Sequence, residues 1–156
     1  MTANASTGFL NALFNGASFK EIFDYGSIEI RSGAQPVNAD AAVSGTLLAR
    51  ITKDGGLWTP GVNTNGLKFQ VVQRYIIADP SQVWRTTGIA NGTAGWFRLR
   101  GNAYDDGLAS LDAPRLDGTI LLAGEGGDAQ MYMHDLNVTD STSSPFVGWT
   151  FTIPPL

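Results

Sequence analysis

Residues 26–52, GSIEIRSGAQPVNADAAVSGTLLARIT, decide the fold expected for this chain of 156 residues. The two ends of this segment alternate apolar and polar residues with a period of two, as half-buried β-strands do. Between them, residues 33–46 are mostly small and include no obvious catalytic group. We therefore predict two strands joined by a long connection, with Asp40 capping a single helical turn over residues 39–43.

Further strand-like stretches follow, rich in β-branched and aromatic residues and separated by Gly, Pro, Asn and Asp. They cover residues 67–79, 82–90, 94–102, 118–124, 129–138 and 146–154. Short strands at this spacing predict a mainly β chain, an antiparallel β-sandwich of jelly-roll or immunoglobulin-like type with about eight strands. The run GEGGD at 124–128 predicts a hairpin turn. The sandwich domain is expected to span residues 26–156.

Residues 1–25 form a different region, which we expect to be a short helical head. Four large apolar residues recur there at helical spacing, and Ser18 with Glu21 matches a capping box at the start of a second short helix. Gly26 is predicted to end that helix. The head either packs on the sandwich or docks onto a neighbouring subunit. The apolar residues on offer are Phe9, Leu10, Leu13 and Phe14.

Composition narrows the classes of function. The net charge is −4, and the 10 Lys and Arg residues are scattered singly, so we expect no nucleic-acid partner. No stretch approaches the length of apolar residues that spans a membrane, so no membrane partner is expected. The first nine residues lack the basic start and apolar run of a secretion signal, which predicts that the chain is made in a cytosol and used without export.

The residues that commonly carry chemistry are sparse. His134 is the only histidine and there is no cysteine, so we predict no enzyme, no catalytic residue, no cofactor and no metal site. Acidic residues are dense in the second half of the chain, where turn formation by Asp and Gly is the favoured interpretation. A structural cation in these loops stays an alternative. The carboxylates are Asp105, Asp106, Asp112, Asp117, Glu125 and Asp128.

Two tryptophans stand out by their surroundings. Trp58 lies in a predicted loop, which makes it a candidate for contact with a partner or a sugar. Trp96 alternates with Phe97 and would share its face with Arg98 and Arg100, which predicts a half-exposed polar face or an interface.

The segment 26–52 resembles a segment in small structural proteins of tailed bacteriophages, which reads roughly LEIYSGxQPAxADxAxxGTLLxT. GTAGWFRLRG at 92–101 is similar to a strand of those proteins, and residues 117–154 resemble their closing hairpins. The first segment carries most of the resemblance. Its matching residues are Ile28, Ile30, Ser32, Gly33, Gln35, Pro36, Ala39, Asp40, Gly45, Thr46, Leu47 and Leu48.

The resemblance implies a virion structural protein, first of all a capsid decoration or cement protein. A neck, collar or tail protein is the alternative, and a carbohydrate-binding module on the virion surface is a further one. The expected partners are other virion proteins, namely the major capsid protein or neck and tail proteins, together with further copies of this chain in a homo-oligomer. The residues predicted to contact partners are Phe9, Leu13, Phe14, Gln35, Pro36, Asp40 and Trp58.

Overall fold

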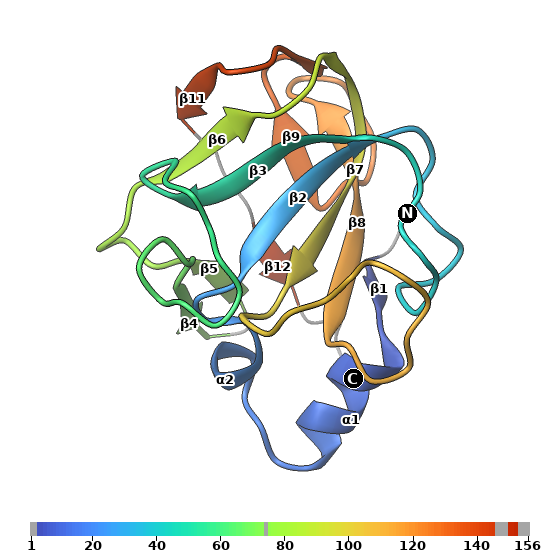
Figure 1. Cartoon of the computed structure of the whole chain (residues 1–156), viewed down its shortest axis with the longest axis vertical. Coiled ribbons are helices and arrows are strands. Elements are labelled where there is room, and N and C mark those ends of the chain that lie inside the picture. The colour runs from blue at the N-terminus through green and yellow to red at the C-terminus, as the bar shows by residue number, and fades with distance from the viewer. Residues whose placement is uncertain (1–2, 74, 146–149, 153–156) are drawn as a thin grey trace.

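The computed structural model describes residues 3–73, 75–145 and 150–152, and it consists of two β-sheets with two short helices at one end (Figure 1). The helices are α1 (Thr7–Phe14) and α2 (Phe19–Phe23). The strands are β1 (Asn4–Ala5), β2 (Ser27–Ser32), β3 (Leu47–Lys53), β4 (Phe69–Val72), β5 (Tyr75–Ala78), β6 (Trp84–Gly88), β7 (Gly92–Arg100), β8 (Arg115–Leu122), β9 (Met131–Met133), β10 (Asn137–Val138), β11 (Ser143–Pro145) and β12 (Thr150–Thr152). The predicted mainly β fold with a short N-terminal helical segment is confirmed.

The larger sheet follows the order β1-β8-β7-β2-β3-β6-β11, and all neighbours along this path are antiparallel. At its centre, Ile28 on β2 lies opposite Ile51 on β3 and Leu99 on β7. Because side chains alternate along a strand, this register gathers the aliphatic residues of all three strands on one face. The polar residues between them lie on the other face.

β9 and β10 fill the region beside β7 and β8. β10 pairs with the start of β7 in antiparallel fashion, whereas β9 pairs with β8 in parallel. The predicted hairpin at 124–128 is therefore wrong, because a hairpin would make β8 and β9 antiparallel. After β8 the chain instead turns back as far as Ile120, and β9 then runs beside the end of β8 in the same direction. Met131 therefore lies opposite Ile120 and is fully buried in the core.

The smaller sheet has the order β12-β5-β4. Residues 67–79, which read as one strand, fold back as a hairpin in which Val72 lies opposite Tyr75. Gln73 adopts a positive φ of 57°, which is uncommon for a residue other than glycine. The β-branched and aromatic residues around it gave no indication of this turn. Of the predicted last strand, Thr150–Thr152 form β12, and Trp149 lies outside the described residues.

The helical head contains the predicted capping box. The Ser18 side chain accepts a hydrogen bond from the Glu21 amide, and the Glu21 carboxylate accepts one from the Ser18 amide. The helix ends at Phe23, before Gly26, and Tyr25 takes the positive φ of 66° that turns the chain. Gly26 serves a different purpose, because a Cβ there would lie 1.8 Å from the Arg100 carbonyl oxygen.

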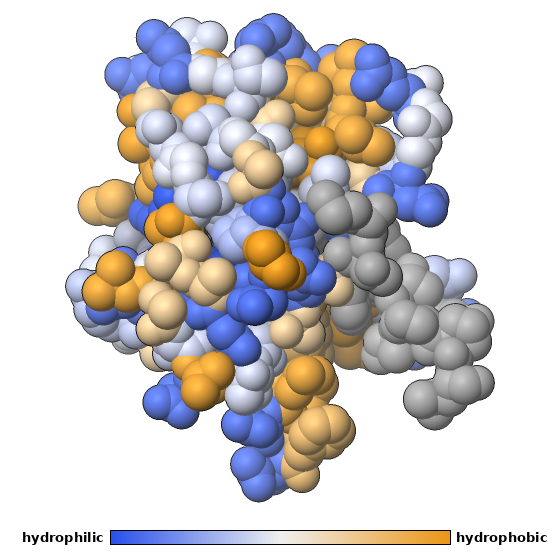
Figure 2. Space-filling model, turned by 90° about the vertical axis from the view of Figure 1, so that its right-hand side faces the viewer, coloured by the Kyte–Doolittle hydropathy of each residue, from blue (hydrophilic) through white to orange (hydrophobic). Residues whose placement is uncertain are grey.

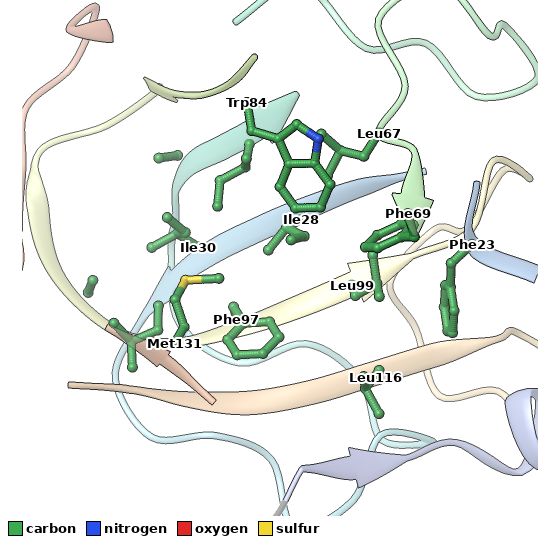
Figure 3. Close-up of a cluster of buried hydrophobic side chains, with 14 of the residues drawn as sticks. Phe23, Ile28, Ile30, Leu67, Phe69, Trp84, Phe97, Leu99, Leu116 and Met131 are labelled. Atoms are coloured by element: carbon green, nitrogen blue, oxygen red, sulfur yellow. The ribbon is translucent and has the colours of Figure 1, made fainter. Parts of the chain in front are cut away.

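The apolar core lies between the aliphatic face of the large sheet and a cover made by the small sheet and the helices (Figure 3). Phe19 of α2 contacts Phe69 of β4 edge to face, with ring centres 5.3 Å apart, and Phe69 contacts Trp84 in the same way at 5.2 Å. Phe9 of α1 belongs to the same cluster. The predicted head, residues 1–25, therefore shares one core with the predicted sandwich.

Candidate functional site

The opposite face of the large sheet carries charged side chains that are nearly as well buried as the core. We call this set the charged face; it consists of Glu29, Arg31, Arg50, Arg98, Arg100, Arg115 and Asp117. The alternation predicted for β7 is correct, but its predicted half-exposure is wrong, since Trp96 and Arg98 are fully buried. Burying charge is costly unless each charge is paired and hydrogen-bonded.

Glu29 lies at the centre of three arginines. Its Oε2 accepts hydrogen bonds from Nε and Nη2 of Arg31 at 3.1 and 3.0 Å, and its Oε1 accepts one from Arg50 at 2.8 Å. Arg100 Nη1 lies 3.4 Å from Oε1. Burial raises the pKa of Glu29, but attraction by Arg100, Arg31 and Arg50 outweighs it and holds the pKa below its usual value.

Arg98 and Asp117 form a second, more isolated pair. Arg98 Nε and Nη2 donate to the two carboxylate oxygens of Asp117, each at 2.7 Å, and neither side chain is exposed to solvent. This bidentate geometry, with two parallel hydrogen bonds, is the arrangement in which a guanidinium binds a carboxylate most specifically. Burial raises the pKa of Asp117, and the hydrogen bonds from Arg98 offset that effect only in part.

Arg115 finds its partner outside the sheet, on the loop that connects β7 to β8. Its Nε and Nη2 donate to Asp105 at 2.7 and 2.6 Å, and the Gly107 amide donates to the same carboxylate at 2.9 Å. Burial raises the pKa of Asp105, but hydrogen bonds from Arg115 and Gly107 outweigh it, so the net pKa lies below its usual value. Asp105 therefore ties this loop to the sheet.

Charge on this side of the sheet is unequal, because the ion pairs join five arginines to three carboxylates. Backbone carbonyls accept further hydrogen bonds from several of these guanidinium groups. Arg98 and Arg115 both donate to the carbonyl of Ala41, and Arg115 also donates to that of Leu108. These carbonyls belong to two loops, residues 33–46 and 101–114, which we call the cover loops.

The cover loops also bind each other. The Val43 amide donates to the Gly107 carbonyl at 2.9 Å, and the Ser110 amide donates to the Asp40 carbonyl at 2.8 Å. The long connection between β2 and β3, residues 33–46, thus lies over its own sheet and supplies acceptors to buried arginines. The small residues predicted there let the backbone approach closely; at Gly45, which has a φ of +68°, a Cβ would lie 1.9 Å from the Ser32 carbonyl oxygen.

Asp40 caps a helix, but a different one from that predicted. Its two carboxylate oxygens accept hydrogen bonds from the amide and hydroxyl of Thr7, at 2.7 and 2.6 Å, at the start of α1. Residues 39–43 contain a turn and no helix. The Asn38 side chain accepts a hydrogen bond from the Ala41 amide there. The prediction of a local cap is wrong because a partner distant in sequence takes the carboxylate.

Gln35 and Pro36, also predicted to contact partners, are both half-buried in the first cover loop. Gln35 Oε1 accepts a hydrogen bond from the Thr119 hydroxyl at 3.2 Å, which fastens the loop to β8. Their contacts with other chains stay a prediction.

The other predicted contact residues divide by exposure. Trp58 does lie in a loop, but its side chain is only 6% exposed, its Nε1 donates to the Tyr25 carbonyl at 2.9 Å, and Arg50 lies over its ring. Phe9 is buried in the core, and Leu13 is half-buried against it. Trp58 and Phe9 therefore face the interior of the protein, which corrects their assignment as partner contacts. Phe14, 84% exposed at the end of α1, keeps that prediction.

The dense carboxylates serve mainly as ion-pair partners and turn formers. Asp105 and Asp106 accept hydrogen bonds from amides two residues further along the chain, as predicted for turns. Asp117 is bound by Arg98. Within the described residues, no group of three His, Cys, Asp or Glu side chains is placed to hold a metal ion. His134 is exposed and follows directly after β9.

The outer surface of the cover loops displays large apolar side chains. Val37 is 94% exposed and Tyr104 80%, and Leu108 and Leu111 are each exposed by more than half. Figure 2 shows this side of the molecule, on which hydrophobic residues appear as separate areas among hydrophilic ones. Hydrogen bonds from buried arginines hold both loops from beneath, and the Arg115–Asp105 ion pair also holds the second one. Both loops carry apolar side chains outward.

None of the helices within the described residues is both long and apolar enough to cross a membrane. Comparisons with protein-family models, with curated proteins and with solved structures found no match to this chain.

Proposed function

We propose that this protein is a structural component of a tailed-phage particle and acts as a decoration or cement protein on the capsid. Its partners are other virion proteins, and the contact runs over the cover loops and the exposed end of α1. Such a role requires a complementary surface and a fixed shape rather than reactive side chains.

The observation that carries this proposal is the combination of exposed apolar side chains and a rigid support. Val37, Tyr104, Leu108 and Leu111 project from loops whose backbones are fixed by Arg98 and Arg115. Loops that are ordered before binding lose less conformational entropy when a partner docks. Exposed apolar residues on such loops are suited to a permanent protein interface.

The resemblance of residues 26–52 to phage structural proteins supports the same proposal. Ile28 and Ile30 lie in the core, Ala39 is a buried residue of the first cover loop, and Asp40 joins that loop to α1. The resembling residues therefore include those that build the support of the proposed contact surface.

The test is a count of copies in purified particles, combined with surface variants. Quantitative mass spectrometry should find the protein in hundreds of copies, whereas six or twelve copies would favour the neck, collar or tail alternative. Absence of the protein from finished particles would contradict both.

A matched pair of variants locates the contact. Leu111→Ser should reduce incorporation of the protein into particles, because it places a polar group in an apolar contact. Leu57→Ser is the control: Leu57 is also largely exposed, but it lies outside the cover loops. Equal incorporation of both variants would show that the cover loops are not the contact surface.

A further inference from the structure

A groove lies at the β6 edge of the large sheet, and residues of β6, β9, β10 and β11 and of the segments next to them line it. The ribbons of β6, β9 and β11 are found near the top of Figure 1. Its volume is about 450 Å³, within the range of pockets that hold small molecules. Side chains from three separate segments line it, including Thr86, Tyr132, His134, Asn137, Thr142 and Ser144. No residue of the charged face or the cover loops lines it.

Tyr132 provides a fixed aromatic surface in this groove. Its hydroxyl donates a hydrogen bond to the Gly127 carbonyl at 2.7 Å and accepts one from the Ala129 amide at 3.3 Å. The side chain nevertheless stays more than one-third exposed. An aromatic ring held in this way offers its apolar face to a ligand without losing further freedom.

Polar groups beside the ring are likewise held by short-range hydrogen bonds. The Asp135 carboxylate accepts from the amide and the side chain of Asn137 through the same oxygen, Oδ1, at 2.8 and 3.0 Å. Within the described part of the chain, its Oδ2 has no protein partner. The Thr142 hydroxyl donates to the Thr139 carbonyl at 2.6 Å, which leaves its lone pairs to accept.

Charge narrows the class of ligand. Among the described residues, neither Lys nor Arg lines the groove, and Asp135 is the one carboxylate there. This lining does not suit a phosphate, a nucleic acid or an acidic polymer, each of which requires positive charge. A neutral molecule with many hydroxyl groups and an apolar ring face matches both the polar groups and the tyrosine.

We propose that this groove binds a neutral saccharide, a hexopyranose or its disaccharide, with one sugar ring against Tyr132 and its hydroxyls bound by Asp135, Asn137 and Thr142. The proposal is independent of the protein's station in a particle. This site differs from the one expected for a carbohydrate-binding module, which used Trp58 and the loop carboxylates. Trp58 is buried, and Asp105 is bound by Arg115.

The experiment uses the purified full chain. Titration calorimetry and ligand-observed NMR with glucose, galactose, N-acetylglucosamine and their disaccharides should show saturable binding in the millimolar range for at least one of them. A glycan array then extends the set to the longer neutral glycans. Absence of saturable binding in all three measurements would overturn the proposal.

Two variants place the binding in the groove. Tyr132→Ala should weaken it about ten-fold by removing the stacking surface, and Asp135→Asn should weaken it through loss of a charged acceptor. Tyr104→Ala is the matched control, since Tyr104 is a more exposed tyrosine on a cover loop, and it should bind as the unchanged protein does. Thermal unfolding checks that all three are folded.

Binding that survives both groove variants, or that is lost equally in the Tyr104→Ala control, would contradict the assignment. Displacement of the saccharide by a peptide from a virion protein, with the peptide binding more tightly, would identify the groove as a protein-docking site and would also overturn it.

Discussion

Neighbouring residues of β7 are buried in two different ways. Phe97 and Leu99 pack into an apolar core, whereas Arg98 and Arg100 are buried on the opposite face against carboxylates and loop carbonyls. The apolar face needs only shape and volume, so many partners could cover it. The buried guanidinium groups of the charged face need carboxylate and carbonyl acceptors at defined positions, so only loops that follow one path can cover it. The core therefore stabilises the fold, while the charged face fixes the path of the cover loops.

The largest effect is expected on the apolar face. Phe97→Ala removes a fully buried ring and should lower the free energy of unfolding by about 4 kcal/mol. Urea denaturation followed by tryptophan fluorescence measures this change. Phe14→Ala is the control, and at an exposed site it should change stability by less than about 0.5 kcal/mol. Similar losses from the two variants would mean that Phe97 is not a core residue.

On the charged face, breaking one pair should cost nearly as much as a core deletion. Arg98→Met leaves Asp117 buried without its partner and should cost about 3 kcal/mol. The double variant Arg98→Met/Asp117→Leu should recover most of that loss, because apolar residues often replace a buried ion pair without penalty. A double-mutant cycle in urea gives the coupling. A single variant with a negligible effect would refute the burial of this pair.

A smaller effect is expected where the first cover loop meets the head. Asp40→Ala removes both hydrogen bonds to Thr7 and should cost about 1.5 kcal/mol. Limited proteolysis should then cut within residues 33–46 sooner than in the unchanged protein. Asp106→Ala, which removes one exposed turn bond, is the control. If the two variants behave alike, Asp40 does not hold the loop to α1.

The smallest effect is a dependence on pH. The pKa of Glu29 is lower in the folded protein than its usual value of 4.5, so its contribution to stability is complete above that value and is lost as the pH falls through the folded pKa. Asp105 acts in the same direction, and Asp117, whose pKa is raised, acts in the opposite one. Stability measured between about pH 6 and about pH 3 should therefore decline towards acid.

Glu29→Gln tests the source of that decline. The variant should be less stable throughout, because three arginines lose a charged partner, but its stability should fall less steeply towards acid. A slope unchanged from that of the original protein would assign the pH dependence to groups other than Glu29.

The sequence pattern correctly predicted the strands and the helix start that depend on residues close together in the chain. The alternation in 26–31 and 94–100 gave β2, β7 and the correct face of each residue, and Ser18 with Glu21 gave the start of α2. Residues 129–138 were predicted as one strand, but they hold two short ones, β9 and β10, which pair with different neighbours. The parallel pairing of β9 with β8 has no local signal, since direction depends on the path of the intervening chain.

The exposure of individual residues was harder to predict. A Trp beside an Arg on one strand face normally indicates a surface, and here both are buried because the cover loops return over them. Trp58 was predicted to be an exposed loop residue, but in the fold its ring nitrogen donates to the Tyr25 carbonyl and Arg50 covers its ring. The groove at Tyr132 is lined by residues between 132 and 144 together with Thr86 and Gly88 of β6, which are distant in sequence, so no local pattern predicts it.

Three properties follow from the residues alone: the chain is mainly β, it begins with a short helical region, and the residues of each central strand divide between two faces. These properties depend on contacts between near neighbours. Tertiary structure alone decided that the second face of the sheet is buried. Each arginine on that face could be solvated equally well in isolation; only the return of residues 33–46 and 101–114 supplies the carbonyls and the carboxylate of Asp105 that make burial possible.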